Sequence, residues 1–525
     1  MSYYTSRLLK ELPFYPGAGE SPDTESVKEL LSNGHTNTKY PADGFIGFHS
    51  VVLCTSNAKQ MSKLYEMSFG FEEIAYRGLE TNSRKIASHV VRNGNIVIEF
   101  VNTLECVDYE SVSPSCDSIE STHSEHGLQE KPHSKIVNEF VGRLVDDQIK
   151  LYTSQNVQDR SSEELKKAIT STPGYAGSLL NVSRSVAKFM DATEKSLQEN
   201  QDAHVIQEFV RRHGEGIINV AFEVVDVDSI FLRAKEAGAT IIKYPNVISD
   251  KYGSVKVATI AIPSTDIHHT LIQNINYRGP YLPSYTQPFG EKHEGHRRIL
   301  QALPPIKLKA IDHYVENYTW NQMMPHAYFY ARIFGFHKYW SVDEEDVSTT
   351  ETALRSIVLA SSNGKIKMPI NEPAKGKKRG QIEEFYDYNG GPGVQHLALT
   401  TYDIVGTVES LKRRGIEFNT TSDAYYANLR KRLANDDIVL KEDFDKLQKL
   451  HILVDYDKST RNPKTKNCFY LLQIFTKPLH DRPTLFIEII QRHHHNGFGK
   501  GTFKGLFESI EQQQRLRGTL VPSDH

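Results

Sequence analysis

The amino-acid sequence predicts an α+β protein in which tandem βαβββ modules form two barrel-like domains. The segment that starts at Phe48 repeats at His313, with the same interval to a shared Phe-Gly-Phe, and the segment that starts at Gly216 repeats at Gly393. In each module an apolar strand precedes an amphipathic helix and further short apolar runs. We therefore expect two similar halves, each made of two modules.

The individual elements follow from local patterns. In the second module of each half, the apolar positions of the predicted helix stop before Gly238 or Gly415, and glycine commonly ends a helix. The last three strands of the second half are expected within 353–360, 468–476 and 484–491. These runs are rich in Ile, Leu, Val and Phe and are short enough to be strands.

The repeats also predict the domain boundaries. We expect an N-terminal extension at 1–40, a degenerate first domain at 41–277, a linker at 278–305 and a second, metal-binding domain at 306–525. The linker is rich in proline, glycine and charge. A polar insertion at about 105–213 interrupts the first domain, and its composition indicates no chemistry.

Composition limits the class of function. The 525 residues include 62 basic and 65 acidic side chains, with a net charge of -3, so no overall field favours nucleic acid or an anionic membrane. The N-terminus lacks an apolar signal region, and no run approaches the ~18 apolar residues of a membrane span. Four cysteines without metal-type spacing indicate a reducing compartment. We expect a cytoplasmic protein.

Three polar residues interrupt apolar runs in the second half. His313, His396 and Glu488 each lie in a segment that otherwise predicts a buried strand. Burying an unsatisfied polar group costs roughly 2 to 7 kcal/mol, and a charge costs more, so Glu488 needs a cation or hydrogen-bond donors. Two imidazoles and one carboxylate form the facial triad of non-haem Fe(II) oxygenases. The sequence therefore predicts an iron site.

A comparison of the two halves predicts where this site lies. The counterparts of the three candidate ligands in the first half are Phe48 (His49 with a one-residue slip), Asn219 and Thr270. In this alignment, none of the three positions has the histidine or glutamate found in the second half. We therefore expect one metal ion per chain, in the second half, with the first half as scaffold or dimer surface.

Several longer motifs identify the chain as similar to a known family. They are LRSIVLA at 354–360, PINEP at 369–373, DRPTLFIEIIQR at 481–492 and GFGKGTFKGLFESIE at 497–511. With these motifs the sequence resembles the 4-hydroxyphenylpyruvate dioxygenase family of the vicinal oxygen chelate superfamily, outside the insertion and the extreme N-terminus. The resemblance implies the vicinal oxygen chelate fold, with a C-terminal helix over the active site.

The resemblance also implies roles for individual residues. His313, His396 and Glu488 match the iron ligands of the family. Strict strand alternation would point Gln395 away from the face of His396, so its implied role requires a local twist or an indirect contact. The residues that match substrate contacts are Ser356, Asn371, Gln381, Gln395, Gln473, Phe475 and Phe503, and those that match the gate or pocket lining are Phe498 and Phe507.

The implied reaction uses Fe(II), one ion per chain, to convert 4-hydroxyphenylpyruvate and O2 to homogentisate and CO2. It combines oxidative decarboxylation, ring hydroxylation and side-chain migration, in tyrosine and phenylalanine catabolism. A homo-oligomer is expected, with a dimer favoured, and no nucleic-acid partner. The alternatives are a relative of the 4-hydroxymandelate synthase type, an extradiol-type enzyme acting on a catechol, and a non-catalytic protein of the same fold that binds a metabolite.

Other features have simpler interpretations. A lone histidine in an apolar strand is more often a hydrogen-bonded core residue than a ligand, so the metal prediction depends on all three residues together. The histidine run at 493–495 follows a strand and precedes a glycine, which favours a solvated turn. The GFGKGT segment at 497–502 lacks the glycine and hydroxyl positions of a phosphate loop, so no nucleotide site is expected.

Overall fold

A computed structural model describes residues 43–105, 196, 198–288, 294–342, 348–499 and 502–523. The expected N-terminal extension and most of the expected insertion lie outside these residues. The chain divides into two units, one of Met1–Leu104 with Ile206–His525 and one of Glu105–Val205. The first of these units contains all the repeated modules.

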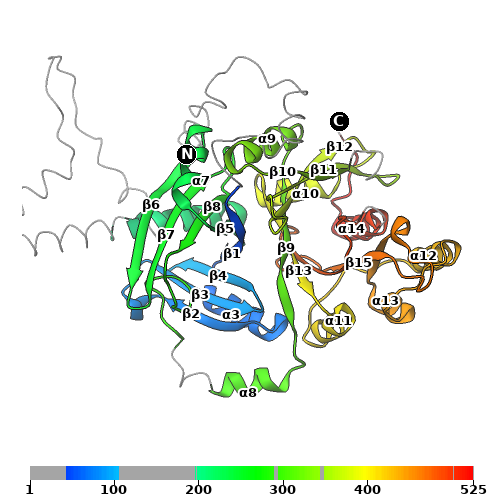
Figure 1. The fold of residues 1–525 in the computed structure, drawn as a ribbon, viewed down its shortest axis with the longest axis horizontal. Coiled ribbons are helices and arrows are strands. Elements are labelled where there is room, and N and C mark those ends of the chain that lie inside the picture. The colour runs from blue at the N-terminus through cyan, green and yellow to red at the C-terminus, as the bar shows by residue number, and fades with distance from the viewer. Residues whose placement is uncertain are drawn as a thin grey trace, which may run out of the picture. The chain divides into compact units, whose positions relative to one another are not determined.

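The first half is one eight-stranded sheet in the order β2-β3-β4-β1-β5-β8-β7-β6 (Figure 1). Its two modules meet where β1 pairs antiparallel with β5, and each module closes with a parallel pair, β1 with β4 and β5 with β8. The elements are β1 (Phe45–Cys54), α3 (Ala58–Phe69), β2 (Glu72–Arg77), β3 (Ile86–Asn93), β4 (Ile96–Thr103), β5 (Gly216–Val224), α7 (Val227–Glu236), β6 (Thr240–Asp250), β7 (Gly253–Ala261) and β8 (His268–Asn274).

The second half repeats this topology in the order β10-β11-β12-β9-β13-β16-β15-β14. Helices α12 and α13 are additions that lie between α11 and β14. The elements are β9 (Leu308–Asn317), α9 (Met323–Phe334), β10 (His337–Val342), β11 (Ala353–Ala360), β12 (Lys367–Ala374), α10 (Gln381–Asn389), β13 (Gly393–Thr401), α11 (Ile404–Arg413), α12 (Asp423–Asn435), α13 (Phe444–Leu450), β14 (Leu453–Asp457), β15 (Phe469–Phe475), β16 (Phe486–His493) and α14 (Phe503–Arg517), and α8 (Glu294–Ala302) precedes them.

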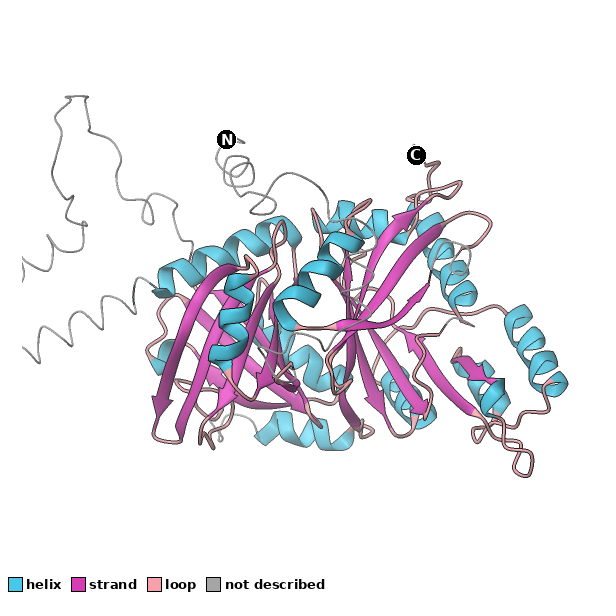
Figure 2. Ribbon diagram, turned by 45° about the horizontal axis from the view of Figure 1, so that its top comes forward, coloured by secondary structure: helices cyan, strands magenta, loops and turns pink. Residues whose placement is uncertain are grey.

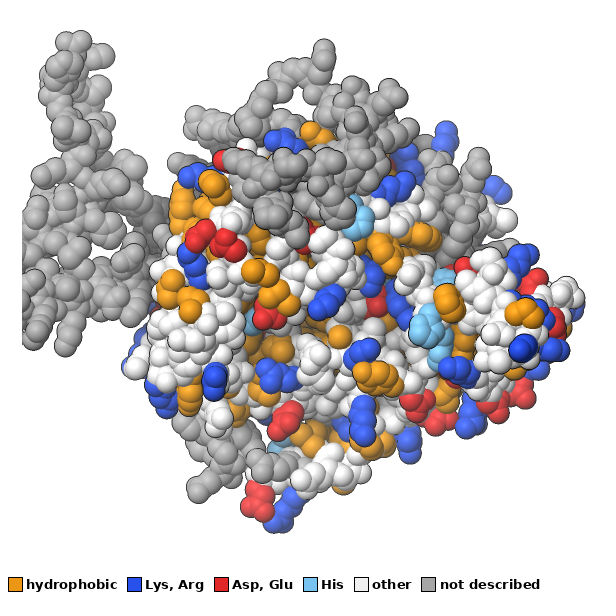
Figure 3. Space-filling view, in the orientation of Figure 1, with side chains coloured by type: hydrophobic (Ala, Val, Ile, Leu, Met, Phe, Trp, Pro, Cys, Tyr) orange, Lys and Arg blue, Asp and Glu red, His pale blue; other side chains and the backbone are white. Residues whose placement is uncertain are grey.

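The equal strand orders confirm the prediction of four βαβββ modules in two halves. Figure 2 shows the two groups of strands, each with helices at its margins. On the face shown in Figure 3, acidic and basic side chains are interspersed. This distribution agrees with the small net charge of the sequence.

The repeated motifs mark helix ends. The shared Phe-Gly-Phe places Gly70 and Gly335 directly after α3 and α9, with φ of 69° and 73°. This left-handed conformation ends a helix at little cost only for residues such as glycine. Gly238 and Gly415 also have positive φ just beyond α7 and α11, as the sequence predicts. The conformational demand explains why both halves keep these glycines.

A tight turn between β3 and β4 packs against the start of β9 and so joins the two halves. The amide of Leu308 donates to Asn93 Oδ1 at 3.1 Å, and the amide of Asn95 donates to the carbonyl of Lys309 at 2.8 Å. Gly94 in this turn has a φ of 60°, and a Cβ there would lie 2.4 Å from the carbonyl oxygen of Leu308. Both the conformation and the close approach therefore require glycine.

A buried polar cluster also joins the halves. The hydroxyls of Tyr318 and Tyr330 donate to the carboxyl of Glu316 on β9, at 2.7 and 2.8 Å. His269 on β8 shares a hydrogen bond of 2.8 Å with Tyr330 and reaches the carbonyl of Val220 through its other nitrogen. Burial raises the pKa of Glu316 to about 7, although the tyrosine hydroxyls oppose this shift.

Replacing Gly94 with alanine should lower the free energy of unfolding by about 2 to 4 kcal/mol, because left-handed strain and overpacking add. Gly364 is a matched control, since its φ is 65° but a Cβ there meets nothing within 4 Å. Gly364→Ala should cost only about 1 kcal/mol. Urea unfolding of both variants measures the difference, and equal losses would contradict the packing argument.

Replacing Glu316 with glutamine should change how stability depends on pH. Because the folded pKa is about 7 and the ordinary value is 4.5, the folded protein binds more protons between these values, and its stability falls as pH rises through them. Glutamine does not titrate. From pH 5 to pH 8 the stability of Glu316→Gln relative to the original protein should therefore rise by about 2 to 3 kcal/mol. A pH-independent difference in thermal unfolding would refute this.

Candidate metal centre

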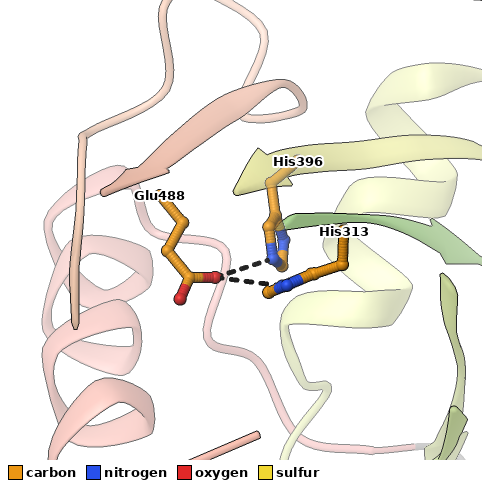
Figure 4. Close-up of side chains that lie close together, drawn as sticks. All are labelled: His313, His396 and Glu488. Carbon is orange, nitrogen blue, oxygen red and sulfur yellow. Dashed lines mark ion pairs between the residues drawn. The ribbon is translucent and has the colours of Figure 1, made fainter. Parts of the chain in front are cut away.

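Three neighbouring strands bring His313, His396 and Glu488 together (Figure 4). Ala398 on β13 pairs with both His313 on β9 and Glu488 on β16, so these two side chains lie at one level of the sheet, and His396 lies two residues before Ala398 on the same face of β13. Glu488 Oε2 lies 3.2 Å from His313 Nε2 and 3.4 Å from His396 Nε2. Among the described residues, these three form the only group of His, Cys, Asp or Glu whose ligand atoms are close enough to hold a metal ion.

The electrostatics of these residues fit a cation. All three side chains are buried, and Glu488 Oε1 has no hydrogen-bond partner within the described part of the chain. Burial alone would raise the pKa of Glu488, but His313 and His396 hold it below its ordinary value. A buried carboxylate with an unpartnered oxygen, beside two imidazole nitrogens, is a donor set for a transition metal with open positions.

The other nitrogen of each imidazole is occupied. His313 Nδ1 lies 2.8 Å from Asp312 Oδ2, and His396 Nδ1 lies 3.0 Å from Gln395 Oε1. Partners at Nδ1 orient each ring and leave Nε2 to face Glu488. Asp312 was not among the sequence predictions, although a charged residue in an apolar strand is the same signal that pointed to Glu488.

The position of Gln395 follows from a β-bulge. The pairing of β13 with β9 shifts by one residue between Val394 and His396. The shift turns Gln395 to the side of His396, against strict alternation, and bulges commonly re-aim side chains in this way. Gln395 Nε2 also donates to Gln381 Oε1 at 3.3 Å, at the start of α10. The local twist and the indirect contact expected for Gln395 are therefore both present.

A cavity adjoins the three residues, which form part of its wall, and the empty space there is about 640 Å3 when the open solvent at its mouth is included. Trp340, Leu354, Val358, Pro369 and Phe486 are wall residues that the sequence reasoning missed, because apolar side chains in strands give no functional signal. The predicted residues in its wall are Ser356, Asn371, Gln381, Gln395, Gln473, Phe475, Phe498 and Phe507, whereas the side chain of Phe503 lies outside the described residues.

Helix α14 covers one side of this cavity. Leu506 and Phe507 pack against Leu354 and Phe475 in one apolar cluster. Thr502, just before the helix, accepts a hydrogen bond of 2.5 Å from Gln473 Nε2. The far end of the helix is held by Arg517, which donates to Glu384 on α10 at 2.8 and 3.0 Å. The helix thus closes the cavity and is anchored away from it.

The first half carries no such group among its described residues. Asn219 and Thr270 occupy the positions of His396 and Glu488, and Asn219 Nδ2 donates to Thr270 Oγ1 at 2.6 Å. The predicted counterpart of His313 was wrong by two residues. Ser50 pairs with Ala221 as His313 pairs with Ala398, so Ser50 is the structural counterpart of His313. The sequence comparison chose Phe48 because the connection from β9 to α9 is two residues longer than that from β1 to α3.

The histidine run at 493–495 does not join the triad. His493 is half-buried and lies 2.8 Å from Glu442 Oε1, and His494 is exposed in the turn after β16. The expected solvated turn is therefore correct for His494, whereas His493 has a partner inside the fold.

Comparisons with known proteins agree with this fold and site. Residues 310–438 match the model of the Glyoxalase/Bleomycin resistance protein/Dioxygenase superfamily. The 4-hydroxyphenylpyruvate dioxygenase of Aspergillus fumigatus is 38% identical over 500 residues, which cover 95% of this chain and 98% of that protein. The enzyme of the same name from Xenopus tropicalis is 36% identical over 484 residues, covering 92% and 95% of the two chains. The chain belongs to the 4-hydroxyphenylpyruvate dioxygenase family.

Solved structures support the fold of this dioxygenase family member. A triple mutant of 4-hydroxymandelate synthase from Streptomyces coelicolor matches with a TM-score of 0.59 and 24% identity, over 90% of this chain and 99% of that one. At this identity the match concerns the fold alone. The family membership and the two curled sheets confirm the vicinal oxygen chelate fold and the enzyme class predicted from sequence. In the described part of the chain, no helix has the length and apolarity needed to cross a membrane.

Replacing Glu488 with glutamine should weaken the binding of a divalent transition metal by more than about 100-fold, because loss of a ligand should cost more than loss of an outer partner. His396→Ala should have a similar effect. Glu442→Gln is a matched control, since Glu442 also pairs with a histidine in this half but lies outside the triad.

Anaerobic metal titration, followed by the metal-induced shift in thermal unfolding, measures the effect. Tight metal binding by Glu488→Gln would contradict the assignment of the site.

Proposed function

We propose that the chain is an Fe(II)-dependent dioxygenase that converts 4-hydroxyphenylpyruvate and O2 to homogentisate and CO2. The observation that carries the proposal is the buried group of two histidines and one glutamate beside a cavity, in a chain 38% identical to a curated 4-hydroxyphenylpyruvate dioxygenase along 95% of its length. This ligand set is typical of non-haem iron oxygenases.

His313, His396 and Glu488 would hold the iron, at one site per chain. Three protein ligands leave coordination positions for a 2-oxo acid and for dioxygen. Bound Fe(II) would supply the activation of dioxygen and the oxidation of the substrate. The first half supports a single site, because Asn219 and Thr270 satisfy each other by a hydrogen bond where the second half has His396 and Glu488.

The polar residues of the cavity would orient the substrate. Gln381 and Gln395 form a hydrogen-bonded chain that ends on His396, and Asn371 donates to Asn317 Oδ1 at 3.1 Å. These contacts restrict the amides before substrate arrives, which lowers the entropy cost of a defined pose. We assign substrate contact to Ser356, Asn371, Gln381, Gln395, Gln473, Phe475 and Phe503.

Aromatic residues would exclude water from the reaction. Phe498 and Phe507 are buried in the cavity wall, and Phe507 belongs to α14. Opening and closing at this end of the cavity would admit the substrate and then isolate it from solvent. Gln473 donates a hydrogen bond to Thr502 just before α14. A substrate that binds Gln473 would therefore compete with Thr502 for this hydrogen bond.

The remaining features of the proposal concern the whole chain. We assign catalysis to 306–525, a scaffold role to 41–277 and a linker to 278–305. A cytoplasmic location is supported by Cys54 and Cys468, which are both free and buried. A homodimer is supported by the edge strand β6, where Ile242, Tyr244 and Val247 are 42%, 62% and 49% exposed.

Hydroxylation of the benzylic carbon to give 4-hydroxymandelate is the second candidate reaction. A solved structure of that enzyme shares the fold, but the relatives with 36% to 38% identity over most of the chain are named for the ring-hydroxylating reaction. The non-catalytic alternative is disfavoured because all three candidate ligands are present and close together.

Product analysis tests the proposal. The purified full-length protein, loaded with Fe(II) and given 4-hydroxyphenylpyruvate, should consume one O2 for each CO2 released and yield homogentisate. Liquid chromatography with mass spectrometry identifies the product, and an oxygen electrode measures uptake. Formation of 4-hydroxymandelate, or absence of substrate-dependent oxygen uptake, would overturn the ring-hydroxylase assignment.

A further inference from the structure

A buried ion pair supports His313 from behind. Arg492 on β16 donates to Asp312 on β9 through two parallel hydrogen bonds, Nε to Oδ1 at 2.9 Å and Nη2 to Oδ2 at 2.8 Å. The side chains of Asp312 and Arg492 are only 5% and 15% exposed. Asp312 Oδ2 also lies 2.8 Å from His313 Nδ1, so one carboxylate serves both the arginine and the imidazole.

The backbone is built to make this contact. The pairing of β9 with β13 shifts by one residue between His313 and Ile311, which places Asp312 at a β-bulge. The bulge that re-aims Gln395 beside His396 lies on the opposite strand of the same pair. Each metal-facing histidine is thus preceded by a bulged residue that binds its Nδ1. The two partners differ in charge, since Asp312 is anionic and Gln395 is neutral.

Arg492 extends this support to the cavity wall. Its Nη1 donates to the carbonyl of His495 at 3.0 Å and to the carbonyl of Gly497 at 2.6 Å, which holds the turn after β16. The guanidinium lies 5.2 Å from the centre of the Phe498 ring, and that ring lies 5.1 Å from the ring of His313. One arginine therefore contacts the partner of His313 and the turn that carries Phe498.

We propose that Asp312 and Arg492 form a positioning unit that fixes His313 as an Nε2 ligand and holds the 493–498 turn, with Phe498, against the metal side of the cavity. The inference rests on the proposed function, in which His313 binds the metal. A carboxylate at Nδ1 keeps the proton on that nitrogen and raises the basicity of Nε2. Arg492 supplies the charge that a buried carboxylate requires, in a geometry that lysine does not reproduce.

A purely structural role for the pair predicts different behaviour. A buried ion pair that only joins β9 to β16 would lower stability when broken and leave the metal affinity of the folded protein unchanged. The chain provides a matched control in the first half. Glu73 is a buried carboxylate that contacts His89 Nδ1 at 2.6 Å and Lys63 Nζ at 2.7 Å, far from any of the three candidate ligands in sequence.

The test compares Asp312→Asn with Glu73→Gln in the full-length protein. Anaerobic titration with Fe(II) gives the affinity, and the visible absorption of bound Co(II) reports the ligand geometry independently of turnover. Asp312→Asn should weaken Fe(II) binding about 10- to 100-fold and change the Co(II) spectrum. Glu73→Gln should leave both within twofold. An Asp312→Asn protein that is folded by circular dichroism and binds Fe(II) within twofold of the original would overturn the proposal.

Arg492→Lys is a second variant that tests the proposal even if Asp312→Asn does not fold. Lysine preserves the charge but loses the two parallel bonds and one or both contacts to the turn. We expect weaker Fe(II) binding, faster amide hydrogen exchange in 493–499 and a larger change in KM for the substrate than in kcat. Unchanged metal affinity and unchanged exchange in Arg492→Lys would overturn the proposal.

Failure of the proposed function gives a distinct result. If the original protein binds Fe(II) but forms another product, the reaction assignment is wrong while the effect of Asp312→Asn on Fe(II) and Co(II) binding still supports the positioning unit. If the original protein binds neither metal at the triad, both the site and the positioning unit are refuted.

Discussion

The pairing of β9, β13 and β16 is the constraint on which the rest of the site depends. His313 and Glu488 both pair with Ala398, so these two candidate ligands on the outer strands meet at one level of the central strand. A slip of one residue in any of the three strands would turn its polar residue to the opposite face. The surrounding hydrophobic faces make such a slip costly, because Leu397, Ile487 and Ile489 are almost fully buried. The packing of the sheet thus preserves the geometry of the centre.

Within this register, two β-bulges turn the side chains of consecutive residues toward each other. Regular strands send neighbouring side chains to opposite faces. At Asp312 and Gln395 the extra residue breaks this alternation, and each side chain binds the imidazole that follows it. Arg492 lies against Asp312, while the two imidazoles lie against Glu488. The ion pair offsets the cost of burying Asp312 and Arg492, and the imidazoles hold the pKa of the buried Glu488 below its ordinary value.

The sequence predicts most of the scaffold and the centre, for identifiable reasons. The repeats reveal the modules because helix-ending glycines and apolar strands recur at fixed spacing, and the triad is visible because polar residues in apolar runs are rare. The contribution of Asp312 and Arg492 could not be predicted, because it depends on a bulge and on a side-chain contact between residues 180 positions apart in sequence. The Phe48 alignment failed for a related reason: counting residues to the helix ignores the longer connection after β9. Helices α12 and α13 have no counterpart in the other half, so the repeat does not predict them.

The first half shows that the fold alone does not create the centre. It has the same strand order and the same two register shifts, at His49 and Ile218. There the equivalent level of the sheet is satisfied by neutral hydrogen bonds, from Asn219 to Thr270 and between Ser50 and Tyr281. Tyr281 belongs to the segment that connects the two halves, and its hydroxyl also donates to Glu99. The connecting segment therefore completes this hydrogen-bond network. The polar groups of this cluster satisfy one another, whereas Glu488 Oε1 in the second half has no hydrogen-bond partner among the described residues. The difference between the first half and the candidate metal centre therefore lies in a few side chains placed on a shared backbone.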